Sequence, residues 1–242
     1  MSTLFLIRHG QASFGAADYD VLSELGGQQA FALGAYWADR DQHLDALYVG
    51  PRRRHRASAR HFLAGARARA RTYPEPQEAP GLDEYPAFEL LHHVRQTIAD
   101  QDPELRAMLA GDPGGPGDAR GMERAFLYMV ERWARGELDT GGLETVTQFR
   151  ARVRAAIGEI AAREGRGKTI AAMTSGGPIC MAVQWALDLA DDVAIRQSWV
   201  IGNGSVSEFR YRDPRAITLV GFNDIGHLRA PSLRSPALVT YR

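Results

Sequence analysis

Cysteine is almost absent from this sequence, because Cys180 is the only one among 242 residues. An internal disulfide and a thiolate-rich metal site are therefore excluded, and this usage is typical of a reducing compartment. Net charge is absent too, since 29 Lys and Arg residues balance 29 Asp and Glu residues. No global field favours nucleic acid or an anionic membrane surface, so any binding of an anion must be local.

Long hydrophobic runs are also missing. The first apolar run reaches Arg8 after a handful of residues, which is too short for a secretory signal or a membrane span. We therefore expect a cytoplasmic protein with no membrane or nucleic-acid partner. Hydrophobic residues nevertheless make up 45% of the chain, which is enough to fill a sizeable core.

Three segments share one pattern: a short apolar run, a turn with polar or cationic residues, and a helical pattern. The runs are 4–7, 44–49 and 169–173. The helix after the first run is expected at about 23–39, the helix after the second is expected to end at about 66, and the helix after the third at about 189. This alternation predicts an α/β fold, with three α/β/α layers around a mostly parallel central sheet. Two last runs, 205–211 and 217–221, predict an edge hairpin.

The pattern changes between about 86 and 142. Helical stretches at 89–100 and 123–135 flank the turn-rich segment GDPGGPGDARG, residues 111–121. We interpret 86–142 as a helical insertion within a single domain, 1–242, lying over the sheet. The insertion is either a lid or plain peripheral packing, and the sequence favours neither.

Cationic and small polar residues follow the three predicted strands. Arg8 and His9 follow the first, the cluster 52–56 follows the second, and the turn 175–177 follows the third. In open α/β sheets the ligand crevice lies outside the carboxyl ends of the strands. We therefore expect three distant parts of the sequence to converge on one pocket.

Several short motifs occur in a recognisable order. They are IRHGQ (7–11), GPRRRHRASA (50–59), LDE (82–84), TSGGP (174–178), NGSVSEF (203–209) and FNDIGHL (222–228). In order and approximate spacing they resemble the histidine phosphatase superfamily, the phosphoglycerate mutase-like proteins, over essentially the whole chain. The resemblance implies that fold and a phosphatase that acts on a small phosphorylated molecule. It implies no cofactor and no metal, because two guanidinium groups would supply the positive charge.

The resemblance assigns a role to each matching residue. Neutral His9 would attack phosphorus and carry a phosphohistidine. Arg8 and Arg54 would bind the phosphoryl oxygens, for which a guanidinium group has the right geometry. Glu84 would protonate the leaving oxygen and later take a proton from water, which requires a raised pKa; Asp83 is the rival carboxylate. The neighbouring arginines of the cluster 52–56 are expected on a solvated helix face.

One position departs from the family pattern. Most members carry a second histidine where this chain has Ser175, followed by Gly176 and Gly177. Losing a preorganised donor typically costs about 3 kcal/mol, although the Ser175 hydroxyl and the two glycine N–H groups at a helix amino terminus offer replacements. On this basis, replacing Ser175 by histidine is expected to raise hydrolysis.

Other readings stay open beside the hydrolase. The pocket is alternatively a phospholigand-binding or regulatory site that turns over very slowly, or His92 or His93 of the insertion replaces the lost imidazole. A mutase is disfavoured, because Gly15 and the segment YPAFEL (85–90) replace the substrate-binding residues that true mutases carry. A homodimer is allowed, but the sequence does not decide the oligomeric state.

Overall fold

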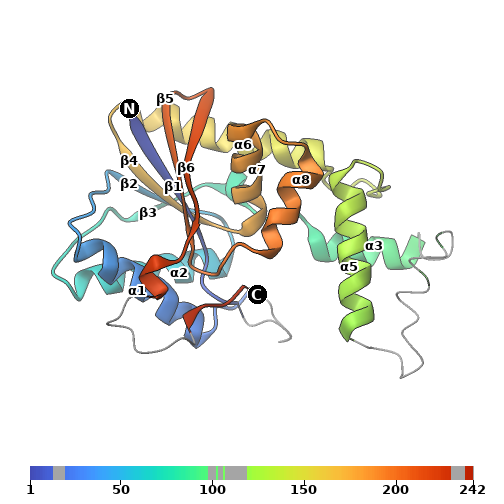
Figure 1. Ribbon diagram of the computed structural model, residues 1–242, viewed down its shortest axis with the longest axis horizontal. Helices are drawn as coiled ribbons and strands as arrows, with labels where there is room; N and C mark the ends of the chain where they lie inside the picture. The colour runs from blue at the N-terminus through green and yellow to red at the C-terminus, as the bar shows by residue number, and fades with distance from the viewer. Residues whose placement is uncertain (13–19, 98–101, 103–105, 107–118, 230–237, 242) are drawn as a thin grey trace.

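The computed structural model describes residues 1–12, 20–97, 102, 106, 119–229 and 238–241. Within them lies one six-stranded sheet in the order β3-β2-β4-β1-β5-β6 (Figure 1). The strands are β1 (Ser2–Arg8), β2 (Ala46–Val49), β3 (Pro76–Glu78), β4 (Thr169–Thr174), β5 (Val206–Asp213) and β6 (Ala216–Asp224). Strands β3, β2, β4 and β1 are parallel, whereas β5 and β6 are antiparallel to their neighbours. The predicted mostly parallel sheet is confirmed, as is the predicted hairpin at one edge.

Both faces of the sheet are buried, which explains the uninterrupted apolar runs of its central strands. On one face, Ile7, Leu47 and Met173 pack with side chains of α1 (Glu24–Ala38) and α2 (Arg53–Arg67). Their neighbours along the same strands pack on the other face with α6 (Val146–Glu164) and α7 (Gly176–Leu187). The three-layer architecture therefore follows from the period of two along each strand (Figure 1).

The α6 helix and the β3 strand are two elements that the sequence analysis does not place. Helix α6 begins at a capping box, in which Thr145 and Gln148 satisfy each other's backbone N–H groups. Strand β3 is only three residues long and pairs with β2 alone. The remaining short elements are η1 (Pro80–Leu82), α8 (Asp191–Ile195), η2 (Arg196–Trp199) and η3 (Gly226–Leu228).

The helices of segment 86–142 are α3 (Ala87–Thr97) and α5 (Ala119–Ala134). They lie beside each other at one end of the sheet, and α5 also packs against α8 (Figure 1). Ring contacts join these elements, since Phe126 lies 6.4 Å from Phe88 and 5.7 Å from Trp199 between ring centroids. Most of the predicted tip, 111–118, and the position Gly15 lie outside the described residues.

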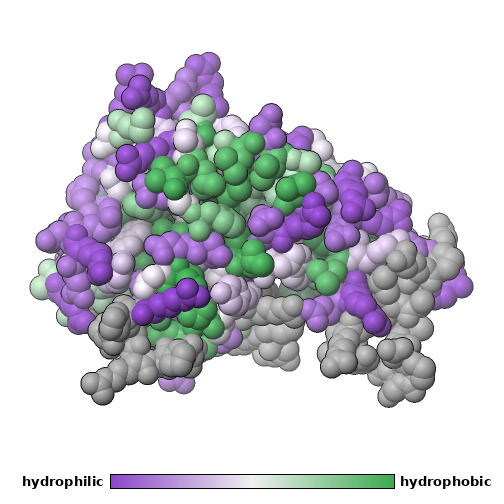
Figure 2. Space-filling model, viewed as in Figure 1, coloured by the Kyte–Doolittle hydropathy of each residue, from purple (hydrophilic) through white to green (hydrophobic). Residues whose placement is uncertain are grey.

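The face seen in Figure 2 is polar at its periphery and apolar toward its middle. Figure 2 shows apolar residues gathered over the face that carries β6, α7 and α8. Leu187, Val200 and Val220 are the exposed apolar side chains from this part of the chain. None of the helices in the described ranges is both long and apolar enough to cross a membrane.

Candidate active site

The His9 side chain lies directly after β1, where the strand leaves the sheet. Its Nδ1 is 2.6 Å from the carbonyl oxygen of Gly10, and its Nε2 accepts a hydrogen bond of 3.1 Å from Arg54 Nε. These contacts place the proton on Nδ1 and leave a lone pair on Nε2. Burial, followed by the charges of Arg54 and Arg8, holds the pKa of His9 well below its usual value. The imidazole is therefore neutral near neutral pH, which is the form of the ring that can act as a nucleophile.

Arg54 connects His9 to the rest of the site. It is the second residue of α2, only 4% exposed, and its Nη1 pairs with Asp20 Oδ1 at 3.0 Å. Asp20 also accepts from the N–H of Arg53 at 2.9 Å, so it serves α2 as a cap that Arg52 does not provide. The third contact, from Arg54 Nη2 to Ser175 Oγ at 3.2 Å, joins the turns after β1, β2 and β4. The predicted convergence of these segments is thus present.

Arg8 is buried on the other side of the same turn. Its Nη1 donates to the carbonyl oxygens of Ile201 and Tyr241, the latter at 3.0 Å. The loop before β5 supports this turn further, because the N–H of Gly204 lies 3.1 Å from the carbonyl oxygens of both Arg8 and His9. The charge of Arg8 lowers the pKa of both His9 and Glu84, so these two side chains lie within its electrostatic reach.

Glu84 follows η1 and lies against the start of α7. Its Oε2 accepts from the N–H of Gly177 at 3.2 Å, and its Oε1 accepts from the N–H of Tyr85 at 3.1 Å. Burial raises the pKa of Glu84, and these N–H groups with Arg54 oppose that rise only in part. A carboxyl group with a raised pKa is suited to donate a proton. Asp83 instead pairs with Arg52, at 2.5 Å from Nε to Oδ1.

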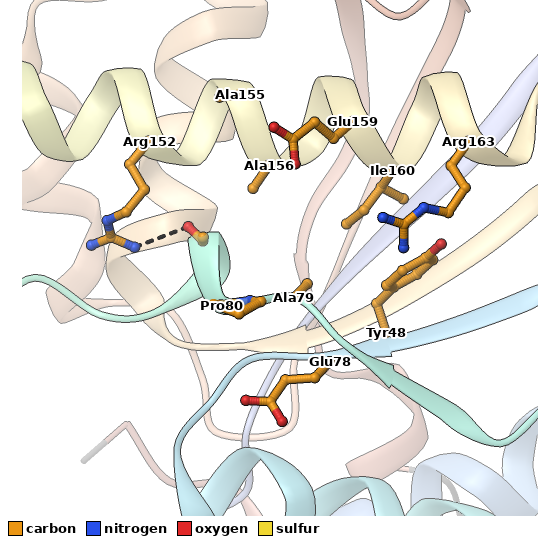
Figure 3. A pocket seen from close by; sticks show the side chains of 11 residues that line it. Tyr48, Glu78, Ala79, Pro80, Arg152, Ala155, Ala156, Glu159, Ile160 and Arg163 are labelled. Carbon is orange, nitrogen blue, oxygen red and sulfur yellow. Dashed lines mark hydrogen bonds between the residues drawn. The ribbon is translucent and has the colours of Figure 1, made fainter.

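The loop that carries Glu84 is held from behind by α6. A cavity of about 250 Å³ lies between α6 and the segment from β3 to η1, and Arg152 is one of the residues that line it (Figure 3). Arg152 Nη1 donates to the carbonyl oxygens of Gly81 at 2.9 Å and Asp83 at 3.0 Å. Its Nε and Nη2 also bind the two carboxylate oxygens of Glu144, at 2.7 and 2.8 Å. The cavity is separate from His9, whereas Arg152 positions the loop that carries Glu84.

The turn after β4 supplies Ser175, Gly176 and Gly177. Ser175 is fully buried, with Oγ 3.2 Å from Arg54 Nη2. The N–H of Gly177 is directed at Glu84, to whose Oε2 it donates. A Cβ on Gly177 would lie 2.0 Å from Glu84 Oε1, whereas a Cβ on Gly176 would meet nothing closer than 3.7 Å. Position 177 therefore admits only glycine while the acid stays in place.

His55 belongs to this site and is not identified as functional by the sequence analysis. It is 0% exposed, its Nε2 lies 2.7 Å from Ser175 Oγ, and its ring centroid is 5.6 Å from that of His9. Helical periodicity is a signal that points to it, because His55, Ser58 and Phe62 share the buried face of α2. His92 and His93 lie elsewhere, on α3, where the ring of His93 lies beside Gly141.

Other chemistries find little support around these residues. Within the described parts of the chain, no group of at least three His, Cys, Asp or Glu side chains is arranged to hold a metal ion. Cys180 is buried in α7, and burial raises the pKa of its thiol far above the usual value. It is a poor nucleophile, as its apolar surroundings in the sequence predict.

Comparison with known proteins was made at the level of families, sequences and structures. The model of the histidine phosphatase superfamily (branch 1) matches residues 4–125 and 87–225. No curated protein sequence matches significantly. A phosphoserine phosphatase from Entamoeba histolytica has 20% identity and a TM-score of 0.59, over 94% of this chain and 100% of its own.

Two further solved structures have the same fold. A phosphoglycerate mutase from Bacillus anthracis str. Sterne has 18% identity and a TM-score of 0.62, over 94% of this chain and 95% of its own. A mycobacterial glucosyl-3-phosphoglycerate phosphatase has 21% identity and a TM-score of 0.58, over 91% and 98%. At these identities the likeness establishes a common fold.

Proposed function

Because the chain belongs to the histidine phosphatase superfamily, we propose that it hydrolyses the phosphate ester of a small molecule through a phosphohistidine on His9. The observation that carries this proposal is the contact between Arg54 Nε and His9 Nε2, at 3.1 Å. It holds the lone pair of a neutral imidazole against a guanidinium group, which is where a phosphoryl oxygen would bind. The solved phosphoserine and glucosyl-3-phosphoglycerate phosphatases, which share the fold, support a small phosphorylated substrate.

The first half of the reaction transfers the phosphoryl group to the enzyme. His9 Nε2 attacks phosphorus, the bond from phosphorus to the ester oxygen breaks, and Glu84 gives its proton to that oxygen. Arg54 and Arg8 neutralise the charge of the phosphoryl oxygens, and Arg54 exchanges its contact with His9 for one with the substrate. The Nδ1–H of His9 stays on the Gly10 carbonyl oxygen, which stabilises the positive charge that the ring acquires.

The second half releases phosphate. Glu84 is now a carboxylate and accepts a proton from water, whose oxygen attacks phosphorus while the bond to Nε2 breaks. Inorganic phosphate leaves, and both His9 and Glu84 return to their starting protonation states. The guanidinium groups supply the positive charge in both halves, so the proposed reaction needs no metal ion.

Hydrolysis of p-nitrophenyl phosphate in the presence of EDTA tests this proposal. The wild-type protein should release p-nitrophenol, and His9→Ala should abolish the release while the variant remains folded by circular dichroism. Brief incubation with radiolabelled substrate should leave label on the wild-type protein that acid removes and base does not. Turnover that survives in His9→Ala would refute the phosphohistidine.

A second candidate function follows from Ser175. A neutral hydroxyl in place of an imidazole favours a site that binds phosphorylated ligands and turns them over very slowly. In that case phosphate would raise the melting temperature of the wild-type protein without measurable hydrolysis. A mutase is the least supported activity, because the residues that retain a second phosphate are replaced at Gly15 and 85–90.

The placement of the insertion completes the proposal. We propose that the chain is a single domain in which 86–142 is an insertion, and that α3 and α5 select the substrate. Activity against a panel of phosphorylated metabolites, measured for the wild type and for variants on α3, would test that assignment. Cytoplasmic location is part of the same proposal and is tested by fractionation of the cells of origin.

A further inference from the structure

The hydroxyl of Ser175 forms its hydrogen bonds with side chains of the candidate active site and not with the helix that it begins. Ser175 is the N-cap of α7, a position where a serine side chain normally accepts from an N–H of the first helical turn. Here it makes no such bond. The Oγ turns instead toward Arg54 Nη2, at 3.2 Å, and His55 Nε2, at 2.7 Å. This serine has therefore given up its structural role as a helix cap for contacts inside the candidate active site.

The backbone around His55 is shaped to hold its ring. A Cβ on Gly50 would lie 2.4 Å from His55 Nδ1, so glycine at this position makes room for the imidazole. The side chain is 0% exposed and cannot reach solvent or a substrate by itself. Burial and the charges of Arg54 and Arg52 hold the pKa of His55 well below its usual value, so the ring is neutral and carries one proton.

A hydroxyl group accepts two hydrogen bonds and donates one. Arg54 Nη2 already donates to Ser175 Oγ. His55 Nδ1 is buried and has no hydrogen-bond partner among the described residues, whereas Nε2 lies 2.7 Å from Ser175 Oγ. The single proton of the ring is therefore assigned to Nε2, which donates to the same oxygen, so that both acceptor positions are filled. The serine proton must then be directed to a third atom, and an anion that binds Arg54 would supply that acceptor. The arrangement thus turns a freely rotating hydroxyl into an oriented donor.

We propose that His55 and Ser175 work as one unit, in which His55 Nε2–H holds the serine oxygen and the serine hydroxyl donates to a phosphoryl oxygen. The inference rests on the proposed function and extends it by a positioning residue. Most family members carry an imidazole at position 175. In this chain the imidazole is that of His55 on α2, and it acts on the site through its hydrogen bond to Ser175 Oγ. The substitution of histidine by Ser175 therefore leaves the site with a full set of donors.

Four variants test the unit through steady-state hydrolysis of p-nitrophenyl phosphate. Ser175→Ala removes the donor and should lower kcat by about a hundred-fold. His55→Phe keeps most of the ring volume but loses Nε2–H, and should lower kcat to a similar extent. The double variant should be no slower than either single variant, because both remove one and the same interaction. His55→Gln, whose Nε2 can still donate, should retain activity within about tenfold of wild type.

A matched control and a second readout separate positioning from loss of structure. His61→Phe makes the same change on the exposed side of α2 and should leave kcat unchanged. Binding of orthovanadate, measured by calorimetry, should weaken in Ser175→Ala and His55→Phe alike, whether or not the protein turns over. The ¹⁵N resonance of His55 Nε2 should have the shift of a protonated ring nitrogen.

A swap of the imidazole gives the sharpest test. Ser175→His alone should fail to raise activity, because His55 Nε2 lies 2.7 Å from the atom that the new ring would replace. Ser175→His combined with His55→Ala should exceed the activity of Ser175→His at least tenfold. The two predictions therefore differ: the sequence alone predicts that Ser175→His raises hydrolysis, whereas the contact with His55 predicts that it does not.

The outcomes distinguish this inference from the proposed function. If His9→Ala abolishes hydrolysis while His55→Phe leaves both kcat and vanadate binding unchanged, the unit is refuted and the phosphatase stands. If the wild type hydrolyses nothing, the phosphatase fails, and equal weakening of vanadate binding by Ser175→Ala and His55→Phe still supports the unit. Additive losses in the double variant, or an unprotonated Nε2, would overturn it in either case.

Discussion

Gly177→Ala is a small change at the point where the acid meets α7. The new Cβ would lie 2.0 Å from Glu84 Oε1, and contacts under 3.0 Å essentially do not occur for a real Cβ. The same Cβ would lie 2.9 Å from Tyr85 Cδ1, but the Tyr85 ring is stacked on Trp133, so the Glu84 side chain must make the larger movement. The carboxyl group must retreat by about 1 Å and lengthen its hydrogen bond to the Gly177 N–H, which is 3.2 Å in the wild type.

The magnitude follows from this displacement. Misplacing a reacting group by 1 Å costs on the order of a hundred-fold in rate, which corresponds to about 2.7 kcal/mol. General acid catalysis accelerates reactions about 10²–10⁴-fold, so a hundred-fold loss removes at least half of the reduction in activation free energy that the acid provides. The fold should survive, because alanine is favoured over glycine inside a helix by about 0.5–1 kcal/mol, which offsets part of the repacking cost.

The assay compares two substrates that depend differently on the acid. We expect kcat/KM for O-phosphoserine, whose alkoxide is a poor leaving group, to fall about a hundred-fold in Gly177→Ala. The fall for p-nitrophenyl phosphate should be smaller, because p-nitrophenolate leaves with little help from a proton. Gly158→Ala is the control: it lies in the middle of α6, its Cβ would meet nothing closer than 3.5 Å, and kcat/KM should not change.

Gly177→Ala contradicts this reasoning if its melting temperature is unchanged and its kcat/KM equals that of the wild type on both substrates. The position of Glu84 would then not limit phosphoryl transfer. Equal losses on both substrates would also contradict the role of Glu84 as the acid. Such a result would move the effect to phosphate binding instead.

Three further perturbations address protonation and support. Glu84→Gln should remove the alkaline limb of the pH profile of kcat/KM. The reaction needs neutral His9, which forms as pH rises through a lowered pKa, and protonated Glu84, which is lost as pH rises through a raised pKa. An alkaline limb that persists in Glu84→Gln would exclude Glu84 as the acid. Arg152→Lys should lower kcat about tenfold, since an ammonium group cannot span the carbonyl oxygens and carboxylate that the guanidinium fork binds, while Arg150→Lys on the same helix should not. Burial lowers the pKa of His227 from 6.5 to about 4. Between pH 6.5 and about pH 4, this histidine is therefore protonated in the unfolded chain but not in the folded protein. The free energy of unfolding of the wild type falls as pH is lowered through this window. His227→Phe should reduce that loss by about 1.4 kcal/mol per pH unit in this window, measured by urea unfolding, and an unchanged slope would contradict the assignment.

The fold could be predicted where each strand is buried on both faces and ends in a turn. The runs 4–7, 44–49 and 169–173 satisfy that condition, and the structure confirms them as β1, β2 and β4. Strand β3 could not be predicted, because Pro-Gln-Glu has no apolar pattern and becomes a strand only by pairing with β2. Helix α6 was predictable in principle from its capping box, since Thr145 and Gln148 have the required spacing.

The candidate site divides in the same way. Motif order picks out His9, Arg54 and Ser175, and the structure joins them through one guanidinium group. The family resemblance favours Glu84 over Asp83, but the two residues by themselves could not be separated, because adjacent carboxylates differ only in what surrounds them. Asp83 meets Arg52, whereas Glu84 meets the start of α7, and these neighbours are distant in sequence.

His55 shows why a departure from a family pattern cannot be judged at one position. Read alone, Ser175 removes an imidazole from the site and predicts a weak enzyme. In three dimensions another imidazole stands 2.7 Å from its hydroxyl, on a helix whose first turn already delivers Arg54. Since α2 is fixed to the turn after β1 through Ser58, which binds the Gly10 N–H and the Arg54 carbonyl oxygen, the replacement donor is as rigid as the nucleophile it serves. Rigidity of this kind is what electrostatic stabilisation of a phosphoryl group requires, because donors that are already oriented need no reorganisation when charge develops.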